Sequence, residues 1–248
     1  MDEVGVEGTE QRGLSQVARV VNIFVAPSAT FQDILRSTSW WLPFVLMAVF
    51  STAATYTIDR QVGFSRVAEN QVQASSKQAE QLTELTPQAR ATQMRMRAIG
   101  TRYTAYAMPV LLLLFFAIYA AIMIGTFNFG LGARMTYRQV LAVSFYASLP
   151  YLLISLLTIL TVCFGSNQES FDMQNPIGTN LAYYLPDAAP WLKALLAQFD
   201  AIKLWTLALT VLGMKTVSKK SLGQAAAVVI GWWLLVVLIA VASVAAFS

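Results

Sequence analysis

The chain has 248 residues, with 17 Lys and Arg against 13 Asp and Glu and a formal net charge of +4. Only 12% of its residues are charged, against roughly 25% in an ordinary soluble domain. Four long stretches carry no charge at all: 37–58, 103–133, 139–168 and 221–248. Because a helix needs about 20 mostly apolar residues to cross a bilayer, this pattern excludes a water-soluble globule. The absence of histidine excludes histidine acid–base chemistry, Ser-His-Asp triads and histidine-ligated metals.

The N-terminal part is polar and then amphipathic. Residues 1–12 are acidic and predict a disordered tail. Within 13–38, apolar residues recur with the spacing of one helical face, namely Leu14, Val17, Ala18, Val21, Phe24 and Val25. We expect a peripheral helix that lies in the interface or docks on the bundle, with Arg19 off the apolar stripe. Pro27 ends it, and a second short helix with Phe31 on its apolar side follows.

Residues 39–248 are predicted to form the membrane domain. Its five spans are expected at about 39–58, 104–128, 139–164, 197–217 and 223–246. Trp40 and Trp41 open the first span as an interfacial aromatic anchor. The fourth span is short, because Lys203 and Lys215 are close together, and it is long enough only if it begins near residue 197.

Two polar segments separate the spans. Residues 59–102 are rich in helix-forming residues, and Thr86-Pro87 is a typical helix start, so we expect two helices with the second running into the next span. Their arginines have no interleaved aromatic residues, which makes nucleic-acid binding unlikely to be their role. Residues 165–196 are predicted to be a polar loop.

The charge count alone does not orient the chain. With five spans the termini lie on opposite sides, and the basic residues divide almost equally between them. The short basic turns 130–138 and 215–221 favour a cytosolic N-terminus, whereas the basic segment 59–102 would then be translocated.

Several local patterns occur together in a known order. They are Phe24-x-x-Pro27-x-x-x-Phe31, then Trp40-Trp41-x-Pro43, then Gly130-x-Gly132-Ala133-x-Met135-Thr136-Tyr137-Arg138 with Tyr146 and Pro150, and finally Asp200-x-x-x-x-Trp205. With five spans, this order resembles the Yip family of membrane proteins, whose eukaryotic members are named for interacting with Ypt/Rab GTPases. The long helical insert resembles the bacterial branch.

The resemblance implies a bacterial inner (plasma) membrane protein with a cytoplasmic N-terminus and a short C-terminus outside. The eukaryotic members have an acidic segment containing Tyr-Gly-Pro in a long cytosolic domain, and residues 1–38 contain nothing like it. A Rab-type GTPase partner is therefore not supported, and the resemblance supplies no activity.

Two groups of residues are candidate sites. Asp200 and Lys203, with Trp205, stand at the start of the fourth span, either as a functional intramembrane pair or as a pair that caps the span at the interface. The turn around Gly130, Gly132, Arg134, Tyr137 and Arg138 is either a surface for a partner or for anionic headgroups, or a structural corner between helices. In the second case the glycines form the turn and Thr136 is the N-cap of the next helix.

The leading functional hypothesis is a non-enzymatic membrane scaffold or adaptor. No cofactor, metal or catalytic constellation is predicted, and no partner beyond the lipid bilayer can be named. The alternative is a small transporter or channel subunit, in which Asp200–Lys203 or the Ser and Thr residues of the third span line the path. An intramembrane hydrolase would need a base other than histidine, and no Ser/Lys or Asp/Asp pair lies in the charge-free spans.

Overall fold

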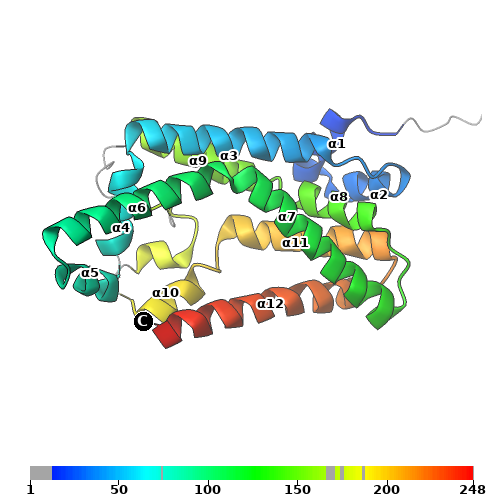
Figure 1. Ribbon diagram of the computed structural model, residues 1–248. Helices are drawn as coiled ribbons and strands as arrows, with labels where there is room; N and C mark the ends of the chain where they lie inside the picture. The colour runs from blue at the N-terminus through cyan, green and yellow to red at the C-terminus, as the bar shows by residue number, and fades with distance from the viewer. Residues whose placement is uncertain (1–12, 74, 166–170, 174–175, 186–187, 248) are drawn as a thin grey trace, which may run out of the picture.

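The computed structural model describes residues 13–73, 75–165, 171–173, 176–185 and 188–247; the predicted tail 1–12 lies outside them. The protein is an all-α polytopic membrane protein, as predicted, because five helical stretches are long and apolar enough to cross a bilayer: Trp41–Gln61, Met108–Gly130, Tyr137–Phe164, Ala201–Ser218 and Leu222–Ala246. In Figure 1 the two N-terminal helices lie at one end of the bundle and the last helix finishes at the other.

The two N-terminal helices pack on each other and on the bundle. They are α1 (Gln16–Val25), capped by the Ser15 hydroxyl, and α2 (Pro27–Arg36), which begins at Pro27. The burial of α1 is the reverse of a simple amphipathic pattern with the charged side outward. Arg19 and Ile23 are fully buried, whereas Val17, Val21 and Val25 are 66%, 54% and 74% exposed.

The reason for this reversal is a buried ion pair. The Arg19 Nε lies 2.6 Å from an Asp33 carboxylate oxygen, and its guanidinium also donates to the backbone carbonyl of Ser37. Since these partners compensate the buried charge, the valine ridge is left to face outward. A fully amphipathic surface helix would have placed the arginine in water.

The first span leads into the helical insert. The elements are α3 (Trp41–Gln61), α4 (Phe64–Gln73), α5 (Ser76–Thr83) and α6 (Pro87–Tyr106), so the insert contains three helices rather than the two predicted. Gly63, with a φ of +80°, lets the chain turn between α3 and α4. The Thr86 side chain caps α6 by accepting from the Ala89 N–H, which confirms the predicted helix start.

The second span continues almost directly from the insert. A break at Ala107 separates α6 from α7 (Met108–Ile124), because Pro109 has no N–H to donate and disfavours continuous helix before it. The span finishes in a π-helical turn, η1 (Gly125–Gly130). Beyond it, Thr136 forms a capping box with Gln139 at the start of α8 (Tyr137–Ala147), which confirms the predicted N-cap.

The third span is broken, although the sequence predicted one continuous helix. α8 ends at Ala147, and α9 (Tyr151–Phe164) begins after a turn in which Leu149 N–H donates to Tyr146 and Tyr151 N–H donates to Ser148. These tighter bonds follow from Pro150, which cannot continue the ladder of α8.

The chain then returns through a loop and two more spans. After η2 (Leu181–Tyr184) and α10 (Pro190–Leu196), the fourth span is α11 (Ala201–Ser218) and the fifth is α12 (Leu222–Phe247). The fourth span therefore begins at Ala201 instead of near residue 197. Figure 1 shows that α11 starts further toward the middle of the bundle than α12 ends.

α8 forms the centre of the bundle. All of its residues from Val140 to Ala147 are buried, and it packs against α1, α2, α3, α7 and α11. Phe145 lies within 5.6 Å, ring centre to ring centre, of three other aromatic rings: Trp40, Phe44 and Phe116. Aromatic burial of this kind contributes both area and favourable ring geometry.

A glycine allows α2 and α8 to approach α11. A Cβ at position 213 would lie 2.5 Å from Val143 Cγ1 and 2.9 Å from Phe31 Cε1, closer than carbon atoms can pack. Gly213 is therefore the contact point at which the second N-terminal helix docks on the membrane domain.

Candidate functional site

Four segments meet at the end of the bundle that carries α1 and α2 (Figure 1). They are the C-terminal end of α2, the turn from η1 to α8, the first turn of α8, and the turn from α11 to α12. Both turns are short and basic, and the sequence separates them by more than eighty residues. The alternation of the spans brings them to one end.

The turn from η1 to α8 is held by an asparagine. Asn128 donates from its side-chain nitrogen to the Met135 carbonyl and accepts from the Met135 N–H, both at 3.0 Å. Gly132 has a φ of +61°, which an L side chain rarely adopts, so the glycine is required by the backbone path. Arg134 lies between these fixed points and is exposed.

The turn from α11 to α12 is equally compact. Lys219 ends α11 in the left-handed conformation, with φ 55° and ψ 27°, and is the one non-glycine residue with positive φ in the described part of the chain. The Ser218 hydroxyl accepts from the Lys220 N–H at 3.3 Å. Ser221 and Gln224 then cap the start of α12.

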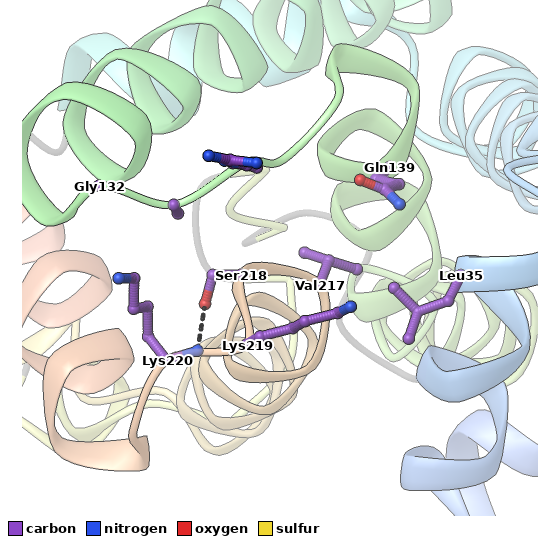
Figure 2. Close-up of a pocket in the computed structure, with 9 residues that line it drawn as sticks. Leu35, Gly132, Gln139, Val217, Ser218, Lys219 and Lys220 are labelled. Atoms are coloured by element: carbon purple, nitrogen blue, oxygen red, sulfur yellow. Dashed lines mark hydrogen bonds between the residues drawn. The ribbon is translucent and has the colours of Figure 1, made fainter.

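These segments line an open cavity of about 460 Å³, which we call the basic cavity (Figure 2). Its lining residues are Leu35, Gly132, Ala133, Arg134, Gln139, Val217, Ser218, Lys219 and Lys220. In Figure 2 the side chain of Lys220 extends toward Gly132, whereas that of Lys219 extends toward Leu35 and Val217. Three of the lining residues are cations and none is an acid.

The cations of the basic cavity have no counter-charge within the described residues. Arg134, Lys219 and Lys220 form none of the salt bridges there. Asp33, the acid at this end of the bundle among the described residues, is already bonded to Arg19 and Arg36. A cavity lined by cations without acids attracts anions, because the attraction between an anion and the cations offsets the repulsion among the cations.

Of the predicted turn residues, the structure places only Gly132 and Arg134 in the basic cavity. Tyr137 is 42% exposed and donates from its hydroxyl to the Ala117 carbonyl of α7, which ties the start of α8 to the second span. Arg138 is exposed, with no salt bridge in the described structure. Gly130 ends η1 in open space.

Asp200 and Lys203 lie far from this cavity in the fold and do not form a direct ion pair. The Asp200 carboxylate caps α11 by accepting from the N–H groups of Ile202 and Lys203, and it also accepts from the Thr179 hydroxyl. The Lys203 ammonium donates to the Ala197 carbonyl at 2.9 Å. The arrangement fastens the preceding loop to the start of the fourth span.

The other predicted site residues take part in packing. Trp205 stacks edge-on against Phe24 of α1 at 5.7 Å. Phe31 is fully buried beside Gly213, Pro27 begins α2, and Pro150 marks the break between α8 and α9. Patterns that the sequence presents separately therefore meet at the contacts between the N-terminal helices and the spans.

Five lining residues were not predicted from the sequence as site residues: Lys219, Lys220, Ser218, Gln139 and Leu35. The basic character of the turns 130–138 and 215–221 is visible in the sequence, and because two spans separate these turns, they must lie on the same side of the membrane. That signal was sufficient to pair the turns. It could not show that they line a cavity, because α2 supplies one wall.

No group of three or more Cys, Asp or Glu residues that could hold a metal ion occurs among the described residues. Two of the acids that lie there have structural roles, since Asp200 caps α11 and Asp33 forms ion pairs. The single cysteine, Cys163, is exposed at the end of α9.

Comparisons with curated proteins and with solved structures gave no match. A family model does match, and it covers residues 21–244, which include α2, the basic cavity, the first four spans and nearly all of the fifth. The match agrees with the resemblance found in the sequence motifs and with the five apolar helices. The chain therefore belongs to the family defined by the Yip1 domain.

Proposed function

We propose that this protein is a non-enzymatic membrane scaffold or adaptor. The observation that supports this function is the filled centre of the bundle, where α8 is buried from Val140 to Ala147 and Phe145 contacts three aromatic rings. A bundle with a packed centre is suited to holding surfaces in a fixed arrangement, because close-packed interiors have low compressibility.

The polar groups inside the bundle support the same function. Ser144 donates to the Val140 carbonyl at 2.9 Å, and Thr210 donates to the Thr206 carbonyl at 2.8 Å, so each hydroxyl bonds within its own helix. Thr206 Oγ1 is the one buried side-chain oxygen or nitrogen without a partner among the described residues. Hydroxyls bonded in this way are typical of packed helices rather than of a hydrated path.

The insert supplies a surface for an adaptor. On α6, Met96 and Tyr103 are 63% and 73% exposed, although both precede the apolar span that begins at Met108. A cleft of about 420 Å³ lies beside them, lined by Ile99, Arg102, Tyr103 and Tyr106. Exposed apolar side chains of this kind outside a span are typical of protein contacts.

An acidic residue holds this surface in place. Asp59, near the end of α3, accepts from the Tyr106 hydroxyl and bonds the Arg102 guanidinium, both at 3.0 Å. α6 is thereby fixed to the first span before it reaches the bilayer. The exposed apolar side of α6, with Met96, Ile99 and Tyr103, is thus held in a fixed position where another membrane protein can bind.

The test is site-specific photo-cross-linking of the full chain in native membranes. A photoreactive side chain at Met96 or Ile99 is expected to capture a reproducible neighbouring protein, whereas the same group at Gln88, exposed earlier on α6, should not. Capture of lipid alone at Met96 and Ile99, with the chain isolated as a free monomer, would count decisively against an adaptor.

Transport is the second candidate, and one observation favours it. The third span is interrupted at Ser148–Pro150, and interrupted helices form the substrate sites of many transporters. The purified chain in liposomes would be tested for flux of a broad panel of ions and small solutes. If the native chain carries a flux and the Pro150→Leu variant does not, the scaffold proposal is contradicted and a transporter is supported.

We also propose that the N-terminus is cytoplasmic and that the membrane is a bacterial inner membrane. Among the described residues, the end that carries α1 and α2 has one acid, Asp33, against seven bases: Arg19, Arg36, Arg134, Arg138, Lys215, Lys219 and Lys220. The opposite end carries a similar number of bases, most of them on α4, α5 and α6, so the positive-inside count by itself does not orient the chain. The proposal is supported by the short basic turns 130–138 and 215–221 and by the orientation that the family resemblance implies.

Labelling of single cysteines tests this orientation. In a Cys163→Ser background, Ser65→Cys reports on the insert and Gly130→Cys reports on the opposite end, where nothing lies within 4 Å of an added Cβ. A membrane-impermeant maleimide applied to intact cells should label Ser65→Cys only. Labelling of Gly130→Cys alone would reverse the orientation.

A further inference from the structure

We propose that the basic cavity binds the phosphate of an anionic membrane lipid headgroup. The inference does not rest on the scaffold function, because a lipid site of this kind would be present in an adaptor or in a transporter.

The charge of the cavity is the first argument. Arg134, Lys219 and Lys220 line one space of about 460 Å³, and no acid lines it. None of the three forms a salt bridge with a described residue. Basic pockets between transmembrane helices are suited to phosphate-bearing headgroups, and each cation near a membrane surface contributes to their attraction.

The depth of the cavity is the second argument, and it favours a lipid over a soluble anion. Val217 and Ser218 belong to the last turn of the fourth span, and Gly132 follows the second span by two residues. The cavity therefore lies where the spans leave the hydrocarbon. Headgroup phosphates occupy this same layer of a bilayer.

The shape of the cavity is the third argument. Its volume falls within the range of roughly 300–1,000 Å³ that small-molecule sites occupy. Leu35 and Val217 contribute apolar side chains to the lining, and Arg134 and Lys220 contribute donors. An anionic lipid presents the same combination, because its phosphate is joined through a glycerol backbone to apolar acyl chains.

The backbone of the cavity shows that it is built rather than incidental. Lys219 adopts a left-handed conformation that costs about 1 kcal/mol or more for a residue with a side chain. Ser218 accepts from the Lys220 N–H and so fixes the position of the second lysine. Gln139 uses its amide oxygen to accept from the Thr136 N–H, and the donor end of that amide has no hydrogen bond within the described structure.

The experiment measures lipid retention by the full chain in mild detergent, using native mass spectrometry with phosphatidylglycerol or phosphatidylcholine as the probe. A double variant of the lining residues, Lys219→Asn with Lys220→Gln, is compared with a matched double variant of two other cations at the same end, Lys215→Gln with Arg138→Gln. Asparagine tolerates the left-handed conformation, so the turn is kept while both variants lose two charges.

The proposal expects phosphatidylglycerol to be retained in preference to phosphatidylcholine. It expects the lining variant to weaken that retention about tenfold or more and the matched variant to leave it within about twofold. Lys220→Arg should retain the lipid, which distinguishes loss of charge from a disturbed turn. Equal thermal unfolding of the two double variants in detergent confirms that both are folded.

Three results would overturn the proposal. Equal weakening by both double variants would mean that general surface charge attracts the lipid. Displacement of phosphatidylglycerol by millimolar inorganic phosphate, with phosphate itself bound, would assign the cavity to a soluble anion. Binding of an acidic peptide with the sequence of residues 1–12, without any preference for phosphatidylglycerol, would assign it to a protein segment.

Discussion

Arg19 and Asp33 form a buried ion pair that joins the two N-terminal helices, with 2.6 Å between the Arg19 Nε and the nearest carboxylate oxygen. The Arg19 side chain is 1% exposed and that of Asp33 is 9% exposed. Arg36 bonds the other oxygen of the same carboxylate, but its side chain is 54% exposed. One acid is thus shared by a buried base and a base in contact with solvent.

Removing the buried base should destabilise the protein strongly. Arg19→Met leaves Asp33 without its buried partner, and breaking a buried pair typically costs about 3–5 kcal/mol. Arg36→Gln removes the exposed base and should cost much less stability, because solvent screens its interaction with Asp33. Thermal unfolding of both variants in detergent provides the comparison.

The double variant Arg19→Met with Asp33→Leu separates two quantities: the destabilisation caused by an unpaired buried charge, and the net contribution of the ion pair to stability. It should recover most of the stability lost in Arg19→Met, because no charge then remains buried. A double variant as unstable as the single one would mean that the packing of the Arg19 side chain, and not its charge, holds α1 in place.

The same carboxylate should make stability depend on pH. Burial acts to raise the pKa of Asp33, but the hydrogen bonds from Arg36 and Arg19 outweigh it, and the pKa lies below the usual value of 3.8. A carboxyl whose pKa is lower in the folded state stabilises the fold above its unfolded pKa of about 3.9 and ceases to do so as pH falls through the folded value.

This effect is measured as the difference in unfolding temperature between the native chain and Asp33→Asn. The difference should be large at pH 6 and should shrink as the pH falls from about 4 toward 3. Other acids titrate in both chains and so cancel. A difference that stays constant over this range would contradict the lowered pKa.

Substitution of Gly213 should separate the N-terminal helices from the bundle. An added Cβ meets Val143 and Phe31 at 2.5 Å and 2.9 Å, so Gly213→Ala should lower the free energy of unfolding by about 1–3 kcal/mol. Gly231→Ala is the matched control in α12, because nothing lies within 4 Å of its added Cβ and alanine favours helix.

A second substitution that removes the clashing atom tests whether the close contact at Gly213 is the cause of the destabilisation. Val143→Ala in the Gly213→Ala background should restore part of the stability, whereas the same change in the native chain should destabilise by leaving a cavity. If both glycine variants had the same stability as the native chain, the close contact of α2, α8 and α11 would not be essential.

The sequence predicted what depends on local composition. Long apolar stretches identified the five membrane helices, and Thr86 and Thr136 identified helix starts, because a cap bonds a residue only three positions away. The family was also recognisable, since its motifs lie around turns and helix ends whose order is visible in the chain.

What the sequence could not predict depends on contacts between distant residues. The burial of Arg19 on α1 was not predicted, because the compensating Asp33 belongs to the next helix. The closeness of Phe31 to Gly213 and the cavity between Leu35, Arg134 and Lys219 are likewise set by how α2 packs on the spans.

The turn at Lys219 gives a prediction that separates backbone strain from charge. Lys219 has a φ of 55° at the end of α11, where glycine is the favoured residue because it has no Cβ. Lys219→Gly should therefore raise the free energy of unfolding by up to about 1 kcal/mol, and Lys219→Val should lower it, because a β-branched residue is strained at positive φ.

Lys220→Gly is the control, since Lys220 does not have a positive φ and gains nothing from glycine. If Lys219→Gly is more stable but retains less phosphatidylglycerol than the native chain, the lysine at this position is explained by its charge. If it is less stable than Lys220→Gly, the packing of the Lys219 stem along Leu35 and Val217 outweighs the strain of the turn. The side chain would then be a structural part of the wall, and its charge would not account for the strained position.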